Sequence, residues 1–288
     1  MPFSYNNLAE RAKIKKLELA IQMGVEERQS YDSVDLAVDI YQTTSGSDPI
    51  MTRADYAADS HMKRTEVDRF YNGAVYMKKF LEFIGTSSKN FNIIKENKVW
   101  SLFYEMGKIL SKNFGDDVES QVRKNETMES YFVLVLHQIH VGVTGDTARN
   151  HVRAFTKNIV TTPNNESFNE DVTDVIEDLA DSLQDSQINS TSDLMKCLIK
   201  ENDLITEFGD TYDSYMRDAR NGESVDKFIR SVKNSVKYFQ ELETNSGLAG
   251  NLRFADVSNE QLQELQTYMR DLNQVSKELF RVYGNEIR

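Results

Sequence analysis

Apolar residues recur every three or four positions along most of the chain, and this spacing predicts helices rather than strands. Outside residues 52–70, we expect helices over about residues 7–23, 33–41, 74–84, 97–110, 128–141, 145–160, 166–186, 192–220, 224–244 and 258–283. The apolar run from Tyr131 to Leu136 would also suit a strand, but its flanks are helical in character and no partner strand is evident. The chain is therefore predicted to be all-α.

Residues 52–70 form the most informative segment, which is predicted to fold as two short helices joined by a tight turn. The hydroxyl of Thr52 is placed to cap the first helix. Ala57 supplies the small side chain required where the two helices cross, and His61 lies in the turn. The inward positions are expected to be Tyr56, Ala57, Met62, Val67 and Phe70. This arrangement is typical of a DNA-binding helix-turn-helix.

The outer face of the second of these helices is predicted to carry Lys63, Arg64, Thr65 and Arg69. A recognition helix presents such side chains to phosphates and base edges. Four features depart from the usual pattern: Ser60 replaces Leu, His61 replaces Gly, and Glu66 and Asp68 add negative charge to this face. The alternative interpretation is an ordinary helical hairpin with a charged outer surface.

The net charge of −12 is unevenly distributed along the 288 residues. Residues 1–160 hold 21 basic and 21 acidic side chains, whereas residues 161–288 hold 13 basic and 25 acidic ones. Residues 49–113 alone hold 11 basic and 7 acidic side chains, so the basic excess coincides with the helix-turn-helix candidate. DNA would be steered toward that segment and repelled by the acidic half.

The polar turn at residues 161–165 is the clearest linker, and the charge changes there. We therefore expect two domains, residues 1–160 with the helix-turn-helix and residues 161–288 as an acidic helical bundle. The last helix begins with a capping box at Ser258 and Gln261. Its apolar positions follow a coiled-coil-like spacing, at Leu262, Leu265, Met269, Leu272, Val275, Leu279 and Val282. This stripe would either join a second copy or another protein, or pack within one chain.

No motif points to catalysis, a cofactor or a metal. His137 and His140 share a helix face near His151, but further ligands at suitable spacing are missing, so packed or hydrogen-bonded histidines are favoured over a metal site. Cys197 is the single cysteine and lies in an apolar stripe, which indicates a core residue in a reducing compartment. No apolar run is long enough to span a membrane and the first residues do not form a signal peptide, so a cytoplasmic protein is expected.

The segment from Leu17 to Leu110 resembles the central helical region of ParB-like partition proteins. The similarity is carried by residues 19–21, 38–41, 52–70 and 77–85, and residues 97–103 resemble the helix that follows in some plasmid and phage relatives. The nucleotide-binding motif of those proteins is missing here, so nucleotide-driven clamping is not implied. The resemblance implies DNA contacts for Lys63, Arg64, Thr65 and Arg69, with Thr52 and Arg53 at a backbone phosphate.

The sequence pattern predicts a protein that binds double-stranded DNA, sequence-specifically or generally, without cofactor or membrane. The resemblance implies a partition-like protein or transcription regulator of plasmid or phage type. Its acidic half, residues 161–288, would serve self-association or partner binding. The rival hypothesis is an acidic protein-interaction module or inhibitor that fills the nucleic-acid groove of a protein partner and never touches DNA. An enzyme is the least favoured hypothesis, because no residue pattern indicates catalysis.

Overall fold

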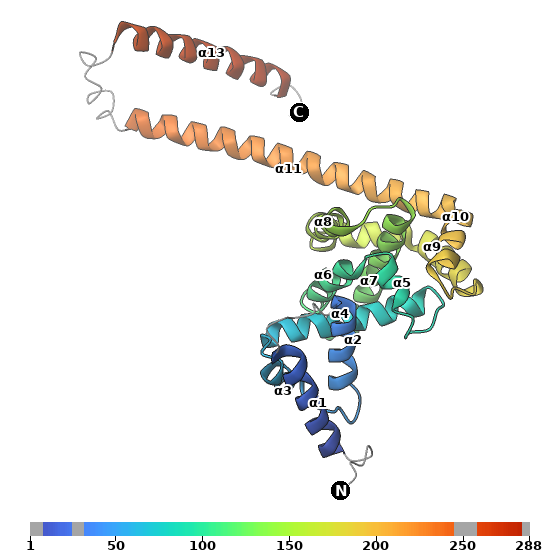
Figure 1. Cartoon of the computed structure of the whole chain (residues 1–288). Helices are drawn as coiled ribbons and strands as arrows, with labels where there is room; N and C mark the ends of the chain where they lie inside the picture. The colour runs from blue at the N-terminus through green and yellow to red at the C-terminus, as the bar shows by residue number, and fades with distance from the viewer. Residues whose placement is uncertain (1–7, 25–31, 245–257, 284–288) are drawn as a thin grey trace. The chain divides into compact units, whose positions relative to one another are not determined.

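The computed structural model describes residues 8–24, 32–244 and 258–283. Regular structure within these ranges is helical throughout and includes no strand, so the all-α prediction is confirmed. In chain order (Figure 1), the helices are α1 (Leu8–Gly24), α2 (Ser33–Thr44), α3 (Arg53–Asp59), α4 (Arg64–Phe83), α5 (Asn92–Glu96), α6 (Trp100–Leu110), α7 (Val118–His140), α8 (Gly145–Phe155), the π-helix η1 (Thr156–Val160), α9 (Asn164–Asp185), α10 (Thr191–Lys200), α11 (Asn202–Thr244) and α13 (Asn259–Tyr283).

Helix α7 is the centre of the main core. Its residues from Tyr131 to Leu136 are at most 1% exposed, so this part of the helix is apolar on every side, as full burial requires. Helices α6, α8, α9 and α10 contact α7 (Figure 1). The helical interpretation of this run is thus confirmed, and the helix begins ten residues before the predicted start, at Val118.

Helix α4 is continuous where the pattern predicted a break before Ala74. Two glycines explain why the chain can remain helical there while packing closely on α6. A Cβ atom at Gly73 would lie 2.8 Å from the Trp100 ring, and one at Gly107 would lie 3.0 Å from the backbone carbonyl carbon of Asn72. These glycines therefore allow a close approach of α4 and α6 rather than ending a helix.

One hydrophobic core crosses the predicted domain boundary between residues 160 and 161. The Phe155 ring lies 5.2 Å from Phe168, which lies 6.0 Å from Phe208, so side chains before and after the boundary share the same cluster. The polar turn resembles a linker in sequence, but it directs the apolar face of α9 back onto α7. The chain instead divides into units at residues 1–221 and 222–288.

The long C-terminal helices also differ from their predicted bounds. A break occurs at Glu201, where the Ser182 hydroxyl of α9 donates to the Glu201 carboxylate at 2.6 Å. In contrast, α11 continues without interruption through Asn221, Gly222 and Glu223, where two helices were expected. The short helix α5 was not predicted at all, because five residues are too few to show a periodic pattern.

Candidate nucleic-acid interface

Residues 60–63 form a short turn between α3 and α4. At the start of α3, the Thr52 hydroxyl accepts a hydrogen bond from the Asp55 backbone N–H at 3.1 Å and donates to the Asp55 carboxylate at 2.7 Å. The predicted cap is therefore confirmed. This reciprocal pair satisfies one of the free N–H groups at the helix start and holds its first turn.

The two unusual turn residues both have a structural explanation. His61 adopts a φ of +56°, in the left-handed region where such turns commonly use glycine. Ser60 is buried, and its hydroxyl donates to the Tyr56 carbonyl oxygen at 2.6 Å. The Met62 N–H donates to the Ala57 carbonyl oxygen at 3.1 Å, which closes the end of α3. The turn is thus hydrogen-bonded despite departing from the usual residue types.

A second, smaller core lies beneath this helical pair. Its buried members are Leu19, Ile40, Met51, Tyr56, Ala57 and Val67, and the partly buried side chains packed on it include Met62 and Phe70. Burial of Tyr56, Ala57 and Val67 confirms three of the predicted inward positions, whereas Met62 and Phe70 are only partly buried. The core draws on α1, α2, α3 and the first turns of α4, so these four elements hold the pair in place.

The Asp39 carboxylate on α2 connects three of these helices. It accepts hydrogen bonds from the Tyr56 hydroxyl at 2.7 Å and from the Lys15 ammonium at 2.5 Å. Burial lowers the pKa of Lys15, but the hydrogen bonds and charges of Asp39 and Glu18 outweigh burial and raise this pKa above its ordinary 10.5. The ammonium group therefore remains charged while buried, because its carboxylate partners are in place.

The start of α4 projects cationic and hydroxyl side chains into solvent. The exposed members of the predicted site are Thr52, Lys63, Arg64, Thr65 and Arg69, whereas Arg53 is half-buried. Glu66 is also exposed, so the face has mixed charge. The later turns of α4 enter the main core, including the fully buried Met77 and Phe80. The exposed face is thus fixed to the body of the protein by the same helix.

Asp68 joins two of the predicted DNA-facing arginines. Its carboxylate accepts from Arg53 Nη1 at 2.8 Å and from Arg64 Nε at 3.0 Å. The Arg53 guanidinium also lies 4.5 Å from the centre of the Tyr71 ring. Arg64 and Asp68 lie four residues apart on one helix, so their ion pair could have been predicted from the sequence. The ion pair between Arg53 and Asp68 depends on how α3 and α4 pack, and no sequence signal indicates it.

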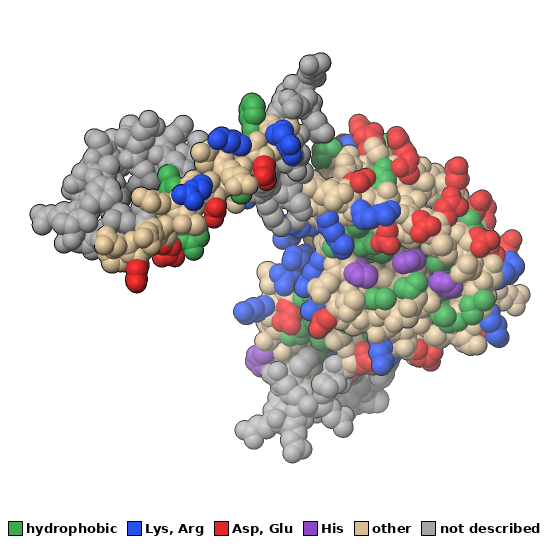
Figure 2. Space-filling view, turned by 90° about the horizontal axis from the view of Figure 1, so that it is seen from above, with side chains coloured by type: hydrophobic (Ala, Val, Ile, Leu, Met, Phe, Trp, Pro, Cys, Tyr) green, Lys and Arg blue, Asp and Glu red, His purple; other side chains and the backbone are tan. Residues whose placement is uncertain are grey.

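The acidic excess is concentrated on another part of the surface. Residues 161–221 contain 15 acidic and four basic side chains. Figure 2 shows the acidic side chains gathered toward one side of the larger body. Helix α9 contributes eight exposed acids and no basic residue: Glu166, Glu170, Asp171, Asp174, Glu177, Asp178, Asp181 and Asp185. The amphipathic acidic helix predicted here is confirmed.

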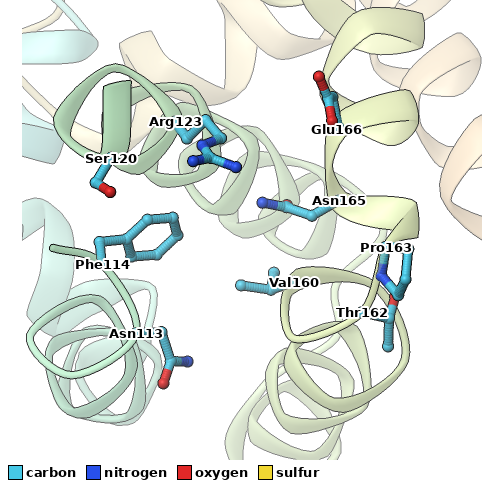
Figure 3. A pocket seen from close by; sticks show the side chains of 9 residues that line it. All are labelled: Asn113, Phe114, Ser120, Arg123, Val160, Thr162, Pro163, Asn165 and Glu166. Atoms are coloured by element: carbon cyan, nitrogen blue, oxygen red, sulfur yellow. The ribbon is translucent and has the colours of Figure 1, made fainter. Parts of the chain in front are cut away.

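A polar cavity of about 260 Å³ lies where the loop after α6, the start of α7 and the start of α9 meet (Figure 3). Phe114, Arg123 and Asn165 reach toward it from these three segments. Arg123 is paired with Glu119 at 3.2 Å, and Asn165 donates to the Thr127 hydroxyl at 3.1 Å. These partners give the lining polar groups a structural role within the fold.

His137, His140 and Cys197 occupy packed positions. His140 Nε2 lies 3.0 Å from the Asn202 side-chain oxygen, and a Cβ atom at Gly209 would lie only 2.6 Å from His137 Nε2. Cys197 is buried, with its sulfur 3.4 Å from the Ser186 hydroxyl. Within the described ranges, no group of three or more His, Cys, Asp or Glu side chains is arranged to hold a metal ion.

The described part of the chain contains no helix with the length and apolar character needed to cross a membrane. Five of the six predicted site residues are exposed around one helical pair, and Arg53 is held beside them by Asp68. No protein-family model, curated protein or solved structure matches the chain.

Proposed function

We propose that this chain binds double-stranded DNA, with α3, the turn at residues 60–63 and α4 acting as a helix-turn-helix. The observation that carries this proposal is the exposed start of α4, which presents Lys63, Arg64 and Arg69 from a helix anchored in two cores. In helix-turn-helix proteins, the first residues of the second helix meet base edges while the first helix crosses the backbone.

The proposal assigns a role to each exposed side chain. Arg64, Thr65 and Arg69 would face base edges or phosphates in the major groove, with Lys63 beside them. Thr52 and Arg53, at the start of α3, would meet a backbone phosphate. Residues 49–113 carry net charge +4, so DNA would approach this end of the larger unit. This assignment also agrees with the proposed relationship to ParB-like partition proteins of plasmids and phages.

Fluorescence anisotropy with a labelled random duplex at about 50 mM salt tests the proposal, since non-specific phosphate binding is strongest at low salt. Replacing Arg64 and Arg69 together by alanine is expected to weaken binding at least about tenfold, because two cationic contacts to the duplex are lost. The matched control replaces the exposed Lys196 and Lys200 of α10 by alanine, which removes the same charge from a different surface.

Failure of the unmodified chain to bind any duplex under these conditions would reject the proposal. It would favour the rival function, an acidic protein-interaction module, which is supported by the eight exposed carboxylates of α9. The negative charge of such a surface resembles that of a phosphate backbone, so the surface would bind the basic groove of a protein partner. Equal weakening by the arginine and lysine variants would indicate a general charge effect instead of a defined site.

A second copy of the chain would extend the proposed site. Dimeric helix-turn-helix proteins place two recognition helices on half-sites about 34 Å apart, one turn of the duplex. Helix α13, with its exposed apolar stripe, is the segment that we propose for this association. A palindromic binding site would follow from that symmetry.

A further inference from the structure

The carboxylate of Asp68 has a position that the proposed DNA contacts do not explain. It lies on the exposed start of α4, among the side chains expected to meet DNA, and carries the wrong charge for that surface. Its two oxygens are each used by a different arginine, Arg53 from α3 and Arg64 from α4. Asp68 thus neutralises part of the positive charge on which DNA binding would depend.

The geometry of this trio resembles an anion site that is already filled. Arg53 Nη1 and Arg64 Nε approach the two Asp68 oxygens at 2.8 and 3.0 Å, the distances of charge-assisted hydrogen bonds. A phosphate group offers oxygens of the same charge to the same donors. The Tyr71 ring beneath Arg53 further restricts where that guanidinium can lie.

The two ion pairs are open to water and can therefore be exchanged. Side-chain exposure is 35% for Arg53, 43% for Arg64 and 36% for Asp68. Ion pairs exposed to this degree contribute little net stability. An incoming phosphate therefore gains these arginines only by displacing Asp68.

We propose that Asp68 is an internal competitor of phosphate, which lowers the affinity of the site for duplex DNA of any sequence. This inference rests on the proposed DNA-binding function and adds a specificity-determining residue to it. In a non-specific complex the exchange of Asp68 for a phosphate gains little, so Arg53 and Arg64 stay paired with Asp68 and neutralise no phosphate. A matching sequence adds base-edge contacts, so the ratio of specific to non-specific binding rises.

The test compares the salt dependence of duplex binding by the full chain and by Asp68→Asn. The amide is close in size to the carboxylate, but it leaves both arginines free to neutralise phosphates. We expect affinity for random duplex at moderate salt to rise about tenfold, and the slope of log K against log salt to steepen by about 1–2, one step per additional phosphate contact.

Glu66→Gln is the matched control. It removes one negative charge from the same exposed face, but no ion pair between Glu66 and an arginine occurs among the described residues. We expect its affinity to change less than that of Asp68→Asn, and its slope to remain that of the unmodified chain. Circular dichroism of both variants would show whether the helices are retained.

The possible results separate this inference from the function on which it rests. Binding by the unmodified chain with no change of slope in Asp68→Asn would overturn the competitor role and leave DNA binding intact. Equal slopes and equal gains for Asp68→Asn and Glu66→Gln would also overturn it, since charge alone would then be responsible. No binding by any of the three proteins would reject the DNA-binding proposal itself.

Discussion

The Tyr56 hydroxyl donates a 2.7 Å hydrogen bond to the Asp39 carboxylate, which links α3 to α2 across 17 residues of sequence. The same carboxylate holds the buried Lys15 ammonium of α1. Three helices therefore meet at one charged group beneath the candidate interface. The position of α3, and with it the proposed DNA-facing surface, depends on this polar contact as well as on apolar packing.

Replacing Tyr56 by phenylalanine removes that hydrogen bond and keeps the ring. We expect the free energy of unfolding to fall by about 1–2 kcal/mol, since hydrogen bonds to charged groups contribute more than neutral ones. Thermal or urea unfolding monitored by circular dichroism measures the change. Tyr104→Phe is the control, because its ring packs on Phe70 and Trp100 while its hydroxyl has no hydrogen-bond partner among the described residues. Equal effects of the two substitutions would contradict the role of Asp39.

Ala57 and Ala58 provide a matched pair for the packing beneath the candidate interface. Ala57 is 6% exposed in the smaller core, whereas Ala58 faces solvent. Ala57→Leu is expected to cost roughly 1–3 kcal/mol of stability by overpacking, while Ala58→Leu should have little effect. Chemical denaturation of both variants tests this expectation. An Ala57→Leu variant as stable as the unmodified chain would show that the two helices do not pack closely at this point.

Helix α13 is expected to join two copies of the chain. Its exposed apolar side chains include Met269, Leu272 and Val275, which are 45–52% exposed. When Leu265, Leu272 and Leu279 are placed at heptad position d, the charged residues of α13 all fall at positions b, c and f, away from the seam. Self-pairing would therefore meet no charge repulsion across the interface.

Sedimentation velocity of the full chain measures this association. Leu272→Glu is expected to yield monomers, whereas Gln274→Glu, which adds the same charge at an outer position of α13, should sediment like the unmodified chain. A monomeric unmodified chain at high concentration would instead assign the stripe to packing within one molecule.

Stability should decrease on acidification because of His137. Burial is the largest cause that lowers the pKa of His137 below 6.5. His140 and His151 lower this pKa further, whereas Asp213 and Asp210 raise it. On acidification the unfolded chain therefore binds more protons than the folded chain. The contribution of His137 to the free energy of unfolding is complete above pH 6.5 and is lost as the pH falls through the folded-state pKa. Urea unfolding between about pH 7.5 and 5 should show a shallower loss for His137→Gln than for the unmodified chain. Parallel curves would exclude His137 as a cause.

Local features of the sequence determined where many helices lie and which residues face inward. The cap at Thr52, the periodic apolar positions of α7 and α9, and the inward Val67 all involve residues within a few positions of one another. Such contacts form within one or two helical turns, so a pattern in the sequence is enough to predict them. The exposure of Lys63, Arg64, Thr65 and Arg69 follows from the same periodicity.

Only the tertiary structure decided how these helices are joined and paired. Asp39 meets Tyr56, and Asp68 meets Arg53, because α1 to α4 pack around one core, and neither contact has a local sequence signal. Gly73 lies inside a continuous helix, and one core includes residues on both sides of the turn at residues 161–165, although both sites resemble breaks. The physical reason is the same in each case: burial against distant residues outweighs the weak local preferences of glycine, proline and polar side chains.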